Sequence, residues 1–114
     1  MRAVFVTLIS LVAATSGLEA QSAGQKIFQG KGLCYNCHGK DGRGTPLAPN
    51  LTDSDWLNID GSLPAIVALV KAGVPKPLKH PAPMPPMGGA KLSQAEIDAV
   101  AAYVKSLSSE KQTR

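Results

Sequence analysis

Two cysteines and one histidine lie within five consecutive positions, as Cys34, Cys37 and His38 in the stretch CYNCHGKDG of residues 34–42. They are the only two cysteines of the 114-residue chain. Thiolates and imidazoles bind metals, and paired thiols can also form a disulfide or react covalently. This stretch is therefore the first candidate for a functional site.

Three kinds of chemistry compete for it. A Cys34–Cys37 disulfide would resemble a redox-active C-x-x-C, but the βαβ context expected of that motif is missing. A zinc site could use both cysteines, His38 and His80, although Cys37 and His38 would be an unusual adjacent pair of ligands. The third reading is C-x-x-C-H, in which both thiols attach haem covalently and the histidine binds its iron. We favour haem, because a short predicted helix precedes the stretch and a long loop that could wrap a cofactor follows it.

The N-terminus has the pattern of a secretory signal peptide. Arg2 precedes an apolar run over residues 3–11, and small and polar residues follow. This run is shorter than the roughly 20 residues that span a bilayer. A buried N-terminal helix is the competing interpretation. We expect residues 1–20 to be removed, which leaves residues 21–114 as one soluble domain in the periplasm or otherwise outside the cytoplasm. Cleavage after Gly17 or Ala23 is an alternative to cleavage after Ala20.

The first helix of the mature domain is expected from Ala23 to about Lys31. Ser22 and Gln25 have the spacing of a capping box, and two glycines follow the helix before the cysteines. A second helix is expected from Leu63 to Ala72, with Ser62 as N-cap and Gly73 at its end.

The last helix has the clearest pattern. Ser93 and Glu96 form a capping box. A buried stripe follows at i, i+3, i+4 and i+7 spacing, namely Ile97, Val100, Ala101, Val104 and Leu107. The polar tail after Leu107 is expected to fray. No strand pattern appears, so the predicted fold class is all-α.

Two long segments lack helical patterns. Residues 39–60 are rich in glycine, proline, asparagine and aspartate, which indicates a loop. Its apolar residues are expected to turn inward, and they are Leu47, Leu51, Trp56 and Leu57. Residues 74–89 contain six prolines, which exclude a helix or an inner strand and predict a stiff, extended loop.

Taken together, these motifs make the chain resemble a class I bacterial c-type cytochrome over residues 23–107. The resemblance rests on the helix with Gly24 and Phe28 and on four segments: CYNCHG, APNL, MPPMGG and LSQAEIDAVAAYVKSL. It implies a small cytochrome c fold, with three to four helices and long loops wrapped around one covalently attached haem c. It also implies that the first and last helices cross, with Gly24 close to Tyr103.

The resemblance also implies which residues surround the haem. Cys34 and Cys37 would form the thioethers, and His38 would bind the iron while the backbone carbonyl of Pro49 accepts a hydrogen bond from it. Met84 is the expected second axial ligand, because the family's ligand methionine is commonly followed by proline. Met87 is the second choice and His80 the third. Trp56 would pack on the haem or bind a propionate, or would only fill the core.

A histidine and a thioether on iron suit the transfer of single electrons. The expected function is therefore a periplasmic monohaem electron carrier, not an enzyme, although it could serve as the electron-accepting subunit of one. The alternative is a haem-based gas sensor or a peroxidase-like protein whose methionine is displaceable.

The charge of the chain bears on its partners. Twelve Lys and Arg residues against eight Asp and Glu give a net charge of +4, spread along the chain rather than clustered as in nucleic-acid-binding arms. This charge favours acidic docking surfaces on redox proteins such as a dehydrogenase, a reductase or a terminal oxidase, and it equally fits ordinary solubility. The candidate contact residues flank the methionine loop and are Lys71, Lys76, Lys79 and Lys91. No nucleic acid and no transmembrane span are expected.

Overall fold

The computed structural model describes residues 15–112, and it describes side chains for residues 18–108. Residues 1–14 of the predicted signal peptide lie outside the described part of the chain. The elements are α1 (Thr15–Phe28), α2 (Tyr35–His38), α3 (Leu63–Ala72), a 3₁₀ helix η1 (Pro86–Gly89) and α4 (Gln94–Gln112). Residues 15–112 contain no strand, and two isolated bridges join Thr45 to Ala48 and Val74 to Met84. The all-α prediction is confirmed.

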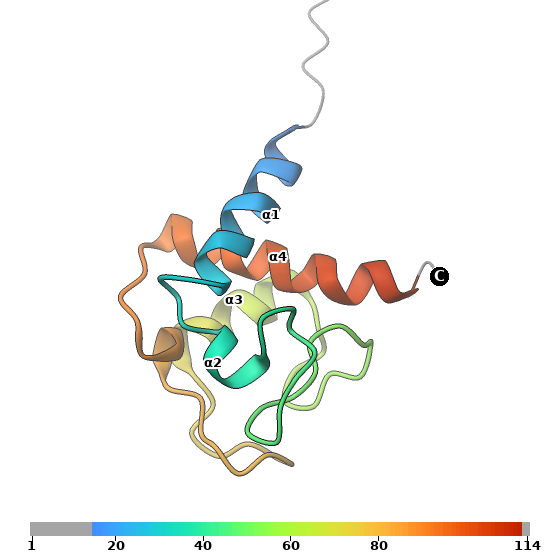
Figure 1. Ribbon diagram of the computed structural model, residues 1–114, viewed down its shortest axis with the longest axis vertical. Helices are drawn as coiled ribbons and strands as arrows, with labels where there is room; N and C mark the ends of the chain where they lie inside the picture. The colour runs from blue at the N-terminus through green and yellow to red at the C-terminus, as the bar shows by residue number, and fades with distance from the viewer. Residues whose placement is uncertain (1–14, 113–114) are drawn as a thin grey trace, which may run out of the picture.

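Helices α1 and α4 cross steeply at the top of the domain (Figure 1). Gly24 is the contact point, because a Cβ atom at this position would lie 2.0 Å from the carbonyl oxygen of Ala99 and 2.8 Å from Cβ of Tyr103. One turn later, the rings of Phe28 and Tyr103 meet edge to face with centroids 5.4 Å apart. The crossing implied by the family resemblance is therefore present.

The predicted start of α1 is wrong. Ser22 lies inside the helix, which already includes Thr15, so the expected capping box does not begin it. Leu18, Glu19, Ala20 and Gln21 extend the helix, and Leu, Glu, Ala and Gln are all strong helix formers. The helix also ends at Phe28, earlier than expected, in a turn in which Gly32 N–H donates to the Ile27 carbonyl.

The predicted ends of the other helices are largely confirmed. Ser62 Oγ accepts a hydrogen bond from Ala65 N–H, and α3 ends at Gly73 with φ +76°. Ser93 Oγ accepts from Glu96 N–H while the Glu96 carboxylate accepts from Ser93 N–H, which is the complete capping box. The prediction that the chain frays after Leu107 is wrong, because α4 continues to Gln112.

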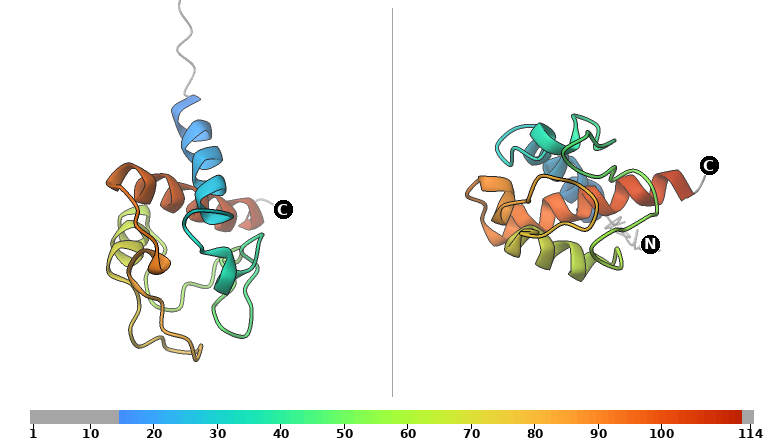
Figure 2. Two further views of the ribbon diagram at one scale, coloured as in Figure 1. Left: turned by 60° about the vertical axis from the view of Figure 1, so that its left-hand side comes forward. Right: turned by 90° about the horizontal axis from the view of Figure 1, so that it is seen from below.

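A single apolar core lies where α1 and α3 pack on α4. Its members are Phe28, Ile66, Val70, Leu92, Ile97, Val100, Ala101, Tyr103 and Val104. Below this core, α2 with its following loop faces α3 with the proline-rich loop (Figure 2). The long loop of residues 39–60 brings Leu51 and Trp56 against the core, as expected. Leu47 is an exception, because it is 46% exposed.

Candidate functional site

The C-Y-N-C-H segment folds into one tight helical turn. Cys34 precedes α2, and its carbonyl accepts hydrogen bonds from Cys37 N–H (3.3 Å) and His38 N–H (3.0 Å). The hydroxyl of Thr45 donates to the Cys37 carbonyl and so ties the end of the turn to the following loop. Cys37 is half-buried beside the turn. The arrangement places two thiols and one imidazole around a single turn of backbone.

His38 is held in one orientation by the backbone of Pro49. Its Nδ1 lies 2.9 Å from the Pro49 carbonyl oxygen, as the family resemblance implied. Because a carbonyl can only accept, Nδ1 carries the hydrogen, and Nε2 of the neutral ring keeps its lone pair. Burial lowers the pKa of His38, the hydrogen bond to Pro49 opposes this effect, and the charge of His80 adds to it. The ring is therefore neutral near pH 7 and presents Nε2 as a potential ligand.

Cys34 lies in a similarly apolar environment. The pKa of its thiol is raised to about 11, mainly by burial and also by the neighbouring Cys37, while a hydrogen bond to the backbone acts in the opposite direction. The thiol is therefore protonated at neutral pH. It is not joined to Cys37 by a disulfide in this structure.

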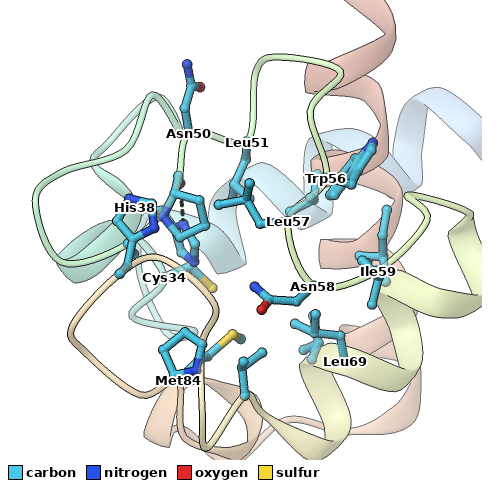
Figure 3. Close-up of a pocket in the computed structure, with 18 of the residues that line it drawn as sticks. Cys34, His38, Asn50, Leu51, Trp56, Leu57, Asn58, Ile59, Leu69 and Met84 are labelled. Atoms are coloured by element: carbon cyan, nitrogen blue, oxygen red, sulfur yellow. Dashed lines mark hydrogen bonds between the residues drawn. The ribbon is translucent and has the colours of Figure 1, made fainter.

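A pocket opens beside these residues (Figure 3). It encloses about 860 Å³, including its open mouth. Its walls come from the end of α1, from α2, from residues 48–51 and 55–59 of the long loop, from α3 and α4, and from the proline-rich segment between residues 74 and 84. Most side chains in the wall are apolar. Cys34 and His38 line one side, and Figure 3 shows the Cys34 sulfur turned toward the interior.

The two methionines occupy different environments. Met84 lines the same pocket as His38, and its sulfur is turned inward (Figure 3). Met87 is absent from the described pocket wall and packs against the apolar core instead. His80, the third candidate, also lines the pocket and is half-buried. The structure therefore brings His38 and Met84 together around one cavity and sets Met87 apart.

The turns before Cys34 and after Met84 lie against each other. A Cβ atom on Gly88 would lie 3.0 Å from the Gly32 carbonyl oxygen. Each turn also contains a non-glycine residue with positive φ, Leu33 at 60° and Met87 at 54°. Such left-handed residues are costly and persist where the surrounding structure holds them. The contact fixes the two segments of the candidate site relative to each other.

Trp56 lines the pocket and also packs against the core. A Cβ atom on Gly61 would lie 2.1 Å from its Nε1, so the indole lies directly on this glycine backbone. Both roles considered for Trp56, contact with a cofactor and filling of the core, are compatible with this position.

The zinc interpretation finds no support in this geometry. Among the described residues, no three His, Cys, Asp or Glu side chains gather as a metal site. Although Cys34, His38 and His80 line the pocket, Cys37 is not part of its wall. An apolar cavity with one thiol, two imidazoles and one thioether on its walls fits a large apolar prosthetic group that contains a metal, and haem is such a group.

Sequence reasoning missed three contributors to the site. Phe28 was identified only as a helix residue, but it lines the pocket and its ring centroid is 6.4 Å from that of His38. Thr45 and Asn58 were part of a loop predicted from composition alone. Thr45 donates a hydrogen bond to the Cys37 carbonyl, and Asn58 accepts one from Leu78 N–H. The sequence contains no signal for such contacts with backbone groups.

Comparison with known proteins identifies the family. Residues 21–108 match the Cytochrome c family. The chain is 37% identical over 90 residues to the cbb3-type cytochrome c oxidase subunit CcoP of Rubrivivax gelatinosus, covering 79% of this chain and 27% of the relative. It is 40% identical over 92 residues to CcoP of Rhodobacter capsulatus, covering 75% and 29%. It is 35% identical over 111 residues to the FixP subunit of Bradyrhizobium sp., covering 90% and 34%. No solved structure matches significantly.

The chain therefore belongs to the cytochrome c family. Membership implies covalently bound haem c and a role in electron transport, in which the domain carries electrons and is not itself the catalyst. The matched segments span about a third or less of the curated relatives' lengths. Within residues 15–112, no helix is long and apolar enough to cross a membrane.

Proposed function

We propose that this chain is a periplasmic monohaem c-type cytochrome that transfers single electrons, with His38 and Met84 as the axial ligands of a low-spin haem. Cys34 and Cys37 would form the thioethers. Residues 1–20 would act as the signal peptide, and residues 21–114 would form the mature domain. The side chains of Leu18 and Glu19 are exposed, and Gly24, where α1 crosses α4, would belong to the mature domain.

One observation carries the proposal: His38 and Met84 line the same apolar pocket as Cys34. The Pro49 carbonyl fixes the imidazole with Nε2 free. The backbone of Met84 is held by two hydrogen bonds to Val74, of 2.8 and 3.0 Å. The imidazole of His38 is thus oriented by a backbone contact, and the backbone that carries the Met84 side chain is anchored beside the same pocket.

Haem c supplies a one-electron iron couple, and a His/Met ligand pair raises its potential. The protein's part is to orient the two ligands, exclude water and leave an edge accessible. The apolar wall provides the exclusion. The open mouth of the pocket provides the access.

The proposed partners are redox proteins with acidic docking surfaces, and a terminal oxidase is the first candidate. Curated relatives are named as subunits of cbb3-type cytochrome c oxidases, which supports this choice. Lys71, Lys76, Lys79 and Lys91 are all exposed. Among the described side chains, none of these four lysines forms an ion pair with a carboxylate.

The test is production in a bacterial periplasm that contains haem-attachment machinery. We expect a protein mass increased by one haem, a low-spin absorption spectrum and rapid oxidation of the reduced protein by a cbb3-type oxidase. Cys34→Ser and Cys37→Ser variants should each lose one thioether. A high-spin spectrum that shifts with carbon monoxide would contradict the proposal and favour the sensor or peroxidase alternative.

A further inference from the structure

The proline-rich loop that leads to Met84 is attached to the rest of the domain at few points. At its base, Val74 and Met84 exchange two backbone hydrogen bonds, which close residues 75–83 into a loop. Within the described structure, these residues make only one hydrogen bond to another part of the chain. The side-chain oxygen of Asn58 accepts it from Leu78 N–H at 3.3 Å.

Asn58 therefore bridges the two loops that form the mouth of the pocket. It belongs to the segment of residues 55–59, while Leu78 lies in the proline-rich loop between Pro77 and His80, two residues that line the pocket. Asn58 lines the pocket and is nonetheless exposed, which places it at the opening. In Figure 3 its side chain extends from its own loop toward the side that holds Met84.

Neither loop has regular structure that would hold this mouth closed. Prolines remove four of the nine backbone donors from the segment 75–83. The described structure shows no backbone hydrogen bond between two residues of this segment. Leu78 does not anchor it by burial, because its side chain is 74% exposed. The single hydrogen bond that Leu78 N–H donates to Asn58 is thus the polar contact that resists outward movement of the loop.

We propose that Asn58 is a positioning residue for the Met84 side of the haem pocket. Its hydrogen bond to Leu78 N–H holds the proline-rich loop closed and so limits the access of small external ligands to the iron position opposite His38. This inference rests on the proposed function. Under this inference, the access of external ligands depends on how readily the proline-rich loop opens, and not only on the strength of the bond between the iron and Met84.

The experiment uses the haem-loaded protein and imidazole as the external ligand. Asn58→Leu keeps the side-chain size but removes the acceptor, whereas Asn58→Asp keeps an acceptor oxygen. Asn58→Ala is a second acceptor-free variant in case leucine disturbs the loop. Leu78→Ala is the matched control, because it removes an exposed side chain and retains the N–H. Imidazole binding to the oxidised protein is followed by absorbance, and exchange of the Leu78 amide hydrogen is followed by NMR.

Loss of one such hydrogen bond should increase the opening of the loop roughly two- to tenfold. We expect Asn58→Leu and Asn58→Ala to bind imidazole and exchange the Leu78 amide faster by that factor, while Val74 and Met84 amides keep their protection. Asn58→Asp and Leu78→Ala should match the wild type. The inference would be overturned if Asn58→Leu and Asn58→Ala bound imidazole and exchanged the Leu78 amide at wild-type rates. It would also be overturned if Asn58→Asp showed the same increased rates as these two acceptor-free variants.

The two proposals fail in different ways. If the wild-type protein lacked the iron–methionine charge-transfer band, the proposed ligand pair would be wrong. Exchange of the Leu78 amide in Asn58→Leu would still decide whether Asn58 holds the loop. If the band were present and Leu78 exchange were unchanged by Asn58→Leu, only the role of Asn58 would be wrong.

Discussion

The backbone of Gly73, at the end of α3, lies directly against the carbonyl group of Met84. A Cβ atom at Gly73 would be 2.5 Å from the Met84 carbonyl oxygen, and the glycine has a φ of +76°. The position of the candidate iron ligand is thus linked to the end of α3 through a site where no side chain fits.

Gly73→Ala should therefore displace Met84 as well as destabilise the fold. We expect a loss of about 2 kcal/mol in the free energy of unfolding, together with a weakened iron–methionine charge-transfer band. Gly89→Ala is the matched control, because Gly89 also has a positive φ of +88° but its Cβ would meet no atom closer than 3.7 Å. The control should cost about 1 kcal/mol and keep the band. If Gly73→Ala and Gly89→Ala weakened the band equally, the link between Gly73 and the position of Met84 would be refuted.

Gly24→Ala should disrupt the crossing of α1 and α4. The added Cβ would overlap the Ala99 carbonyl at 2.0 Å, and backbone cannot move aside as a flexible side chain can. We predict a loss on the order of 3 kcal/mol, measured by denaturant unfolding of the haem-loaded protein. Gln25→Ala, at an exposed position on the same helix, should change stability by less than about 0.5 kcal/mol. A Gly24→Ala variant as stable as this control would contradict the close packing.

Glu96 should make stability depend on pH. The hydrogen bonds from the Lys31 ammonium, at 2.8 and 3.0 Å, lower the pKa of this carboxyl, and the bond from Ser93 N–H adds to the effect. Because the folded-state pKa is depressed, the stabilisation is present above the unfolded pKa of about 4.3 and is lost as pH falls through the folded-state pKa.

Glu96→Gln keeps an acceptor for the cap but removes the charge that pairs with Lys31. We expect it to lower the midpoint of denaturant unfolding at pH 7, and the difference from wild type should shrink as the pH falls below 4. Asp41→Asn, at an exposed position whose side chain makes no described hydrogen bond, is the control and should show no such trend. A difference for Glu96→Gln that stays constant with pH would argue against the ion pair.

Reversing charge beside the methionine loop should slow electron transfer to an acidic partner. Lys76→Glu and Lys79→Glu together should reduce the second-order rate with a cbb3-type oxidase several-fold at low ionic strength, and the difference should shrink as salt screens the charges. Lys26→Glu on α1 is the control, because Lys26 is exposed and belongs to neither the methionine loop nor the segments that flank it. Rates and salt dependence that do not change in the double variant would exclude this surface.

Much of the fold was predictable because its signals are local. The capping box of Ser93 and Glu96, the N-cap at Ser62 and the stripe on α4 follow from spacing along the chain. The start of α1 was not predictable, because the S-x-x-Q pattern at Ser22 is weak compared with the helix-forming residues before it. Local signals of similar strength compete, and packing of the whole helix decides between them.

The residues of the candidate site also fall into those that a local sequence signal predicts and those that it does not. C-x-x-C-H is a local motif, so Cys34, Cys37 and His38 stood out at once, and the family resemblance supplied Pro49 and Met84. Asn58 did not stand out, because its partner is a backbone N–H twenty positions away. Contacts to backbone groups across loops carry no residue pattern, and only the fold reveals them.

The most direct test of the account is the iron–methionine charge-transfer band of the oxidised protein, measured in wild type, Met84→Ala and Met87→Ala. The two substitutions are chemically identical, so they differ only in where the side chain lies. We predict a band in the wild type that survives in Met87→Ala and disappears in Met84→Ala. A band lost in Met87→Ala and retained in Met84→Ala, or absent from the wild type, would contradict it.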